Sequence, residues 1–197
     1  MTRATEILEH EHRTIEKIVR VISVLVDDLT ETRDVDGSIL RDLCDFLRVY
    51  GHQCHHGKEE SYLFPLLESR GVPEEGCPLG ALRHEHQRSR ALTDTLIEAT
   101  SRYSANPFLG RQTLVEVLRD LASFYPAHIW KEEYLLFPLV KKVLSAQEDE
   151  LLQKEFESVE ADIYSNAHER YESLAADLER RVLAASPKMR SVITKIA

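Results

Sequence analysis

One short pattern occurs twice in this chain and restricts the fold more than any other feature. The pattern is His-x-x-Lys-Glu-Glu, followed by an apolar run and a proline, and it occupies residues 55–65 and 128–138. A histidine and a glutamate four positions apart lie about 40° apart around a helix axis, so one metal ion can contact both. The sequence therefore predicts two helices that each carry a pair of metal ligands.

Apolar residues recur at steps of three and four along four segments of the chain, the spacing of one buried helix face. They predict helices over residues 5–30, from about 38 to a loop at 69–78, from about 79, and from 107. At one level, histidine or glutamate replaces the apolar residues of every stripe. These six candidate metal ligands are His12, His55, Glu59, His86, His128 and Glu132.

The order of these residues indicates an internal repeat. His12 lies 43 residues before His55, and His86 lies 42 residues before His128. Two copies of a helical hairpin make a four-helix bundle. We therefore predict an all-α protein with an up-down four-helix bundle over residues 1–146. A further amphipathic stripe predicts an additional C-terminal helix within residues 147–197, packed on the bundle or, in a homodimer, on a partner subunit.

A second repeated element, His-Glu-His, covers residues 10–12 and 84–86. Residues two apart on a helix lie about 200° apart, so only one histidine of each triplet can face the interior. The stripes place His12 and His86 inside, and we expect His10 and His84 to face outward.

Composition and charge exclude several classes of protein. The chain has 197 residues, of which 30% are charged, and its formal net charge is −9; this argues against general nucleic-acid binding. No apolar run approaches the ~20 residues of a membrane helix, and the N-terminus lacks a signal-peptide core. Three cysteines cannot all pair and show no Cys-x-x-Cys spacing. We expect a cytoplasmic protein without nucleic-acid or membrane partners.

The types of the candidate ligands limit the metal. Imidazole and carboxylate without thiolate suit iron, manganese or zinc, and six ligands are too many for one tetrahedral zinc ion. Two ions bridged by Glu59 and Glu132, with a shared oxo or hydroxo bridge, use all six residues, as in di-iron bundles. A dinuclear zinc or manganese hydrolase is a weaker alternative, because the sequence suggests no substrate pocket.

These motifs resemble the hemerythrin-like (HHE cation-binding) family of bacterial type. The resemblance covers residues 5–145 and rests on the sequential pattern H…HxxxE…H…HxxxE, with Leu-Phe-Pro after each glutamate. His168-Glu169-Arg170-Tyr171 also resembles part of a longer bacterial subgroup. The resemblance implies a non-haem di-iron centre that binds dioxygen, nitric oxide or hydrogen peroxide.

One position departs from the pattern of the oxygen carriers. Those proteins have a second histidine on the third helix, and this chain has Arg90 there. The departure implies that one iron loses a ligand, which favours redox chemistry with peroxide or nitric oxide over oxygen carriage. The alternative is a non-catalytic sensor or store of oxygen, nitric oxide or iron. Such a protein needs the same metal ligands as an enzyme, so the ligand pattern does not distinguish the two. The sequence leaves open whether the protein is an enzyme.

Three further histidines and one cysteine lie near the predicted site. We expect His52 at the surface, and the sequence leaves open whether His56 orients a ligand or packs between helices. His168 could cap the open end of the site or supply a seventh ligand. Cys54 is expected to be a packed thiol.

Overall fold

The computed structural model describes residues 3–163 and 166–185, which are almost entirely helical and contain no strand. The first bundle helix is α1 (Arg3–Thr30). The second is one long rod with two π-helical segments, in the order α2 (Gly37–Phe46), η1 (Leu47–His55), α3 (His56–Lys58), η2 (Glu59–Leu63) and α4 (Phe64–Ser69). The third rod is α5 (Leu79–Ala105). The fourth consists of α6 (Pro107–Lys131), η3 (Glu132–Leu136) and α7 (Phe137–Val143).

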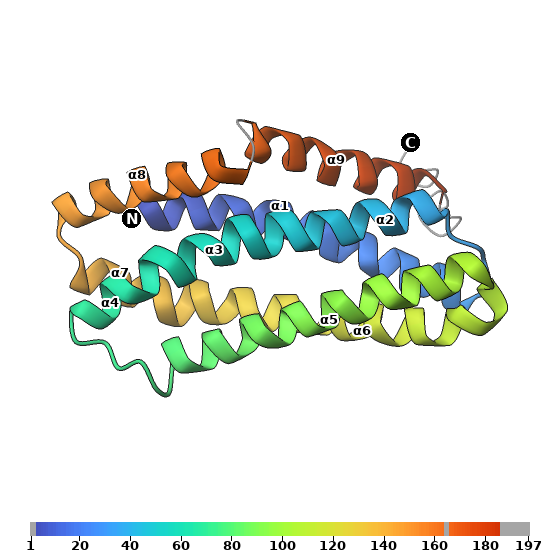
Figure 1. The fold of residues 1–197 in the computed structure, drawn as a ribbon, viewed down its shortest axis with the longest axis horizontal. Helices are drawn as coiled ribbons and strands as arrows, with labels where there is room; N and C mark the ends of the chain where they lie inside the picture. Colours follow the sequence, from blue (N-terminus) through green and yellow to red (C-terminus); the bar gives the residue numbers. More distant parts are fainter. Residues whose placement is uncertain (1–2, 164–165, 186–197) are drawn as a thin grey trace, which may run out of the picture.

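The four rods run side by side along the long axis of the molecule (Figure 1). Two further helices, α8 (Ala146–Ile163) and α9 (Ala167–Ala185), lie outside the bundle along α1. The predicted all-α bundle with a C-terminal helical addition is therefore confirmed. The addition consists of two helices where one was predicted, and Asn166 lies in a turn just before α9. The division into domains at residue 146 stays a prediction.

The helix starts follow from capping residues. Asn106 caps α6, and its side-chain oxygen accepts hydrogen bonds from the backbone N–H groups of Phe108 (3.1 Å) and Leu109 (3.3 Å). Near this start α6 passes very close to α5. A Cβ atom added to Gly110 would lie 2.4 Å from the Cα of Tyr103, so only glycine fits at this crossing.

The π-helical segments coincide with the repeated motif. Pro65 and Pro138 are each the second residue after a π segment, η2 and η3 respectively. A proline cannot donate a backbone hydrogen bond, and its ring clashes with the carbonyl four residues earlier. That carbonyl lies in the π segment in both copies, where the wider turn can accommodate the ring. The helix therefore continues through Pro65 and ends at Ser69.

The hydrophobic core is divided into two clusters by a layer of polar side chains. Leu8 belongs to one cluster and Ile15 to the other, with the buried His12 between them in the sequence. In the same way Leu82 and Leu96 fall in different clusters on either side of His86. The histidines and glutamates of the repeat therefore lie in the middle of the bundle, with an apolar cluster on each side.

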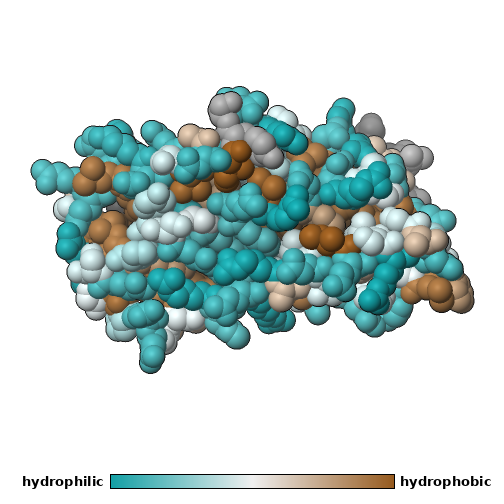
Figure 2. Space-filling view, in the orientation of Figure 1, coloured by the Kyte–Doolittle hydropathy of each residue, from teal (hydrophilic) through white to brown (hydrophobic). Residues whose placement is uncertain are grey.

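The visible surface is mostly hydrophilic, with apolar atoms in small separate groups (Figure 2). One such group lies at the end of the molecule where α5 turns into α6, and Phe108 and Leu109 are exposed at this turn. Within residues 3–163 and 166–185, no helix has both the length and the apolar character that a membrane span requires.

Candidate metal centre

The structure brings the six predicted ligand residues together in the polar layer. Each of them is at most 1% exposed to solvent. Ligand atoms of His12, His55 and Glu132 lie within 4.8 Å of one another, and those of Glu59, His86 and Glu132 form a second such group. Glu132 is common to both groups, so the two possible ion positions are adjacent.

The two carboxylates stand between the imidazoles. The Nε2 atoms of His12 and His128 lie 3.0 Å from opposite oxygens of Glu132. The Nε2 atom of His86 lies 3.3 Å from Glu59 and 3.5 Å from Glu132. Each carboxylate therefore faces histidines from more than one helix, as a bridging ligand must.

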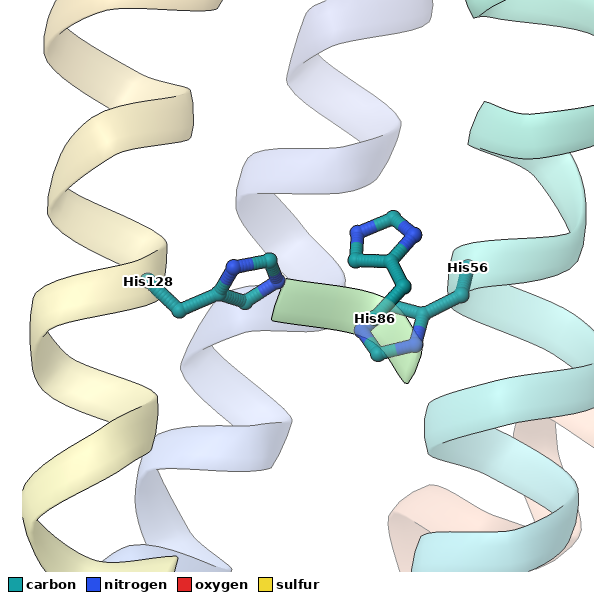
Figure 3. A group of neighbouring side chains, drawn as sticks. All are labelled: His56, His86 and His128. Atoms are coloured by element: carbon teal, nitrogen blue, oxygen red, sulfur yellow. The ribbon is translucent and has the colours of Figure 1, made fainter. Parts of the chain in front are cut away.

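His56 joins this layer, although its sequence position does not lie on the predicted stripe. Its ring is fully buried and stacks on that of His86, with centroids 3.8 Å apart. Ligand atoms of His56, His86 and His128 lie within 4.8 Å of one another, and the three side chains converge from three helices (Figure 3). On a regular α-helix His56 would lie about 100° around the axis from His55, so the helix period alone does not predict that both face inward. The π segment η1, which ends at His55, adds a residue to the turn and lets both neighbours face inward.

The inward-facing atoms of these seven residues fit a metal cation. None of these atoms has a hydrogen-bond partner among the described residues. They are the Nε2 atoms of His12, His55, His56, His86 and His128, and both carboxylate oxygens of Glu59 and Glu132. The 3.0 Å approaches to Glu132 do not have hydrogen-bond geometry. Buried polar atoms without partners cost of order 1–3 kcal/mol each. Converging nitrogen and oxygen donors without thiolate are the ligands that iron, manganese or zinc accept.

Four glutamates hold the opposite ring nitrogens, and the sequence prediction did not include them. The bonds between histidine Nδ1 and carboxylate oxygen are His12–Glu133 (3.0 Å), His55–Glu11 (2.9 Å), His86–Glu60 (2.7 Å) and His128–Glu85 (3.0 Å). Such a carboxylate fixes the orientation of the ring and leaves Nε2 free for a metal. Each of the four glutamates directly precedes or follows a predicted ligand, and this adjacency was the available signal.

These bonds follow the internal repeat. Glu11 and Glu85 each hold a histidine from their own half of the chain, whereas Glu60 and Glu133 each hold one from the other half. The two hairpins are therefore linked to each other through the site.

In each half of the chain, a lysine donates a hydrogen bond to the glutamate that holds a histidine of the same half. Lys131 donates to Glu85 at 2.5 Å, and its side chain is 32% exposed. Lys58 donates to Glu11 and also to Glu160 of α8, and its side chain is 0% exposed. The C-terminal helices thus bury the lysine of one half of the duplicated site, whereas the lysine of the other half stays partly exposed.

The electrostatics of the metal-free site favour protonated histidine. Burial opposes the charged form of His55, but the carboxylates of Glu59 and Glu11 outweigh it and raise the pKa of His55 to about 10. Burial also opposes ionised Glu11, and His55 with Lys58 nevertheless lowers its pKa to about 2. Without metal, the carboxylates therefore favour the protonated form of His55, whereas burial and the neighbouring histidines hold the pKa of His56 well below its usual value.

Aromatic rings pack against the histidines. Phe64 and Phe137, the phenylalanines of the two Leu-Phe-Pro motifs, stack on His86 and His12, with ring centroids 5.6 Å apart in both pairs. The motif therefore has a packing role at the site in addition to its effect on the helix. Apolar rings beside the ligands also exclude water from this layer.

The remaining expectations had mixed outcomes. His10 and His84 are exposed, as predicted. The surface position expected for His52 is wrong, because its side chain is partly buried and its Nδ1 lies 3.3 Å from Nδ1 of His56. Cys54 is 1% exposed, so it is a packed thiol as expected, and burial raises its pKa to about 12.

Arg90 and His168 lie outside the group of inward-facing ligands. Arg90 does not fill the position of the missing histidine but donates to Glu60 at 3.1 Å. His168 lies beyond Glu11, with its Nδ1 atom 3.8 Å from the Glu11 carboxylate, so it belongs to the surroundings of Glu11.

Residues 3–140 match the hemerythrin HHE cation binding domain, and this range contains every residue of the polar layer. The chain belongs to this family. Among curated relatives of this HHE chain are uncharacterized proteins of Mycobacterium bovis and Mycobacterium tuberculosis, each 28% identical over 157 residues. The aligned region covers 80% of this chain and 61% of each relative, so the chain spans about three fifths of their length. No solved structure matches the chain.

Proposed function

We propose that this HHE protein holds two non-haem iron ions, with an oxo or hydroxo bridge, and binds a small ligand there: dioxygen, nitric oxide or hydrogen peroxide. The observation that supports the proposal most is the set of buried, inward-facing donor atoms without hydrogen-bond partners in the polar layer described above. A hydrogen-bond network of ordinary core residues would have paired these atoms.

The positions of the donors suggest how they are shared. His12 and His55 would hold one ion, and His86, His128 and His56 the other. Glu59 and Glu132, which face histidines of both groups, would bridge the two ions. The ion at His12 and His55 then has one donor fewer, and it is the one with room for an external ligand.

Bound iron would supply the electrons and the open coordination position for reaction with such a ligand. The chain itself restricts the size of the ligand. Each of the seven donor residues is at most 1% exposed to solvent, so a large molecule has no direct access to them. A small diatomic molecule or a peroxide therefore suits the site better than the larger substrate of a hydrolase.

A second candidate function is supported by His56. The absence of a histidine at position 90 favoured an enzyme, because it left one iron without a ligand. If His56 supplies the missing donor, only one ion is left open, and that arrangement suits reversible binding in a sensor or store of oxygen, nitric oxide or iron.

Stopped-flow mixing of the iron-loaded protein with hydrogen peroxide distinguishes the two functions. Sustained release of oxygen over many turnovers supports an enzyme, and a single bleaching event supports a sensor or store. His55→Ala is the control that should abolish either response. An iron-loaded protein whose spectrum does not change with peroxide, nitric oxide or dioxygen would contradict both.

A further inference from the structure

A cavity of about 650 Å³ lies outside the bundle, where α1, α8 and α9 meet. Four glutamates line it, Glu6, Glu157, Glu160 and Glu169, whereas Arg3 is its one permanently cationic lining residue. The excess of negative charge in a concave surface attracts cations from solution.

Two histidines and a carboxylate converge at this cavity. The Nε2 atom of His10 on α1 lies 2.6 Å from Oε1 of Glu172 on α9, and Nε2 of His168 lies 3.1 Å from the same oxygen. The two imidazole rings stack, with centroids 5.9 Å apart. One ligand atom from each of the three residues lies within 4.8 Å of the others.

We propose that His10, His168 and Glu172 form a separate site for a divalent transition-metal ion, with zinc as its representative. Two histidines and one glutamate are a known ligand set for zinc, and the fourth position is then open to water. Tetrahedral ligands about 2.1 Å from a zinc ion lie roughly 3.4 Å apart, so only small side-chain movements would be needed. Two of the three proposed ligands, His10 and His168, also line the acidic cavity.

The other nitrogen of His168 supports this assignment. Its Nδ1 atom is buried, has no hydrogen-bond partner in the described part of the chain, and points towards Glu160 (3.6 Å) and Glu11 (3.8 Å). The central histidines also present Nδ1 to a carboxylate, at shorter, hydrogen-bonding distances, and Nε2 to the ligand group. A carboxylate behind the ring is the usual support of a metal-bound histidine.

The site is distinct from the central one and joins different parts of the chain. Glu11 and Lys58 lie between His168 and the buried His55, so the two sets of donors do not meet. An ion here would fasten α9 to α1 beside the buried Lys58–Glu160 contact. His84, the counterpart of His10 in the repeat, is exposed on α5 and has no place in this cluster.

Zinc titration of the iron-loaded protein tests the proposal. Elemental analysis should find one zinc ion per chain in addition to unchanged iron, and calorimetry should show one saturable site. Cobalt(II) in place of zinc should give the visible absorption of a four-coordinate ion. His168→Ala and Glu172→Gln should each weaken zinc binding by at least about tenfold, since loss of even an outer partner costs that much.

His84→Ala is the matched control and should bind zinc like the unmodified protein. Far-ultraviolet circular dichroism of each variant checks that its helices remain. The proposal is overturned if the unmodified protein binds no additional zinc, or if His168→Ala and His84→Ala bind it equally. It is also overturned if Glu172→Gln loses iron together with zinc, because the residues would then belong to the central site.

Discussion

The Oε1 atom of Glu60 lies 2.7 Å from the Nδ1 atom of His86, so a residue of the second bundle rod holds a histidine of the third. The repeat contains the reciprocal bond, in which Glu133 of the fourth rod holds His12 of the first at 3.0 Å. Because each half of the chain orients a histidine of the other half, the site requires both hairpins. One hairpin alone would keep only one of the four histidine–glutamate bonds.

Protein produced with iron supplied should contain close to two iron ions per chain. His55→Ala and His128→Ala should halve or empty the site, because each removes a buried donor. His10→Ala and His84→Ala should keep both irons, since these side chains face away from the polar layer. Elemental analysis checks the ratio.

An iron ratio near one, or tightly bound zinc that iron does not displace, would contradict the dinuclear iron assignment. Equal iron loss in all four variants would show that the inward and outward faces of the helices have no bearing on metal binding.

His56→Leu should lower the iron affinity at one of the two positions by about tenfold or more, a loss known even for partners outside the ligand set. The reason is that Nε2 of His56 is buried and unpaired beside His86 and His128. Leucine keeps most of the volume, so the bundle should still fold. Iron retention during dialysis against a chelator measures the effect, with His84→Ala as control. If His56→Leu retains both irons with an unchanged spectrum, His56 has a packing role only.

Lys58→Met should destabilise the metal-free protein by about 3 kcal/mol, because it leaves Glu11 buried without its ammonium partner. Lys131→Met is the matched control from the other half of the repeat. Its side chain is 32% exposed, and loss of such a pair costs less than about 1 kcal/mol. Urea unfolding measures both free energies. Equal losses would mean that the cover formed by α8 contributes nothing to the Lys58 contact.

The metal-free protein should lose stability as pH rises from about 6.5, the usual pKa of histidine. In the folded protein His55 titrates at about 10, because neighbouring carboxylates outweigh the opposing effect of burial. Its protonated form therefore stabilises the fold fully below 6.5, and this contribution disappears between 6.5 and 10. Bound metal replaces these protons, so the gap between the melting temperatures of loaded and metal-free protein should widen over this range and shrink in acid.

Melting curves at pH 6, 7.5 and 9 measure this gap. Exchange of Glu59 and Glu132 together for glutamine should remove most of it, since both carboxylates that face the two groups of histidines lose their charge. If the melting curves of the loaded and the metal-free protein coincide at pH 7.5, the metal is weakly bound and does not stabilise the fold.

The sequence by itself determined the helical fold and six members of the buried polar layer. The reason is that helix period and ligand spacing are local properties. A histidine that replaces an apolar residue on a stripe, as His12 and His128 do, must lie in the core wherever the helix packs. The repeat of these stripes then implied a bundle of two hairpins.

Only the tertiary structure decided which neighbours complete the layer. His56 turns inward because π segments change the rotation of the second rod, and no stripe of period 3.6 anticipates an added residue. The contacts of Lys58 with Glu160 and of His10 with Glu172 join residues more than 100 positions apart. Such contacts depend on where α8 and α9 lie against α1, and that position is set by packing between helices, which the spacing of residues within one helix does not specify.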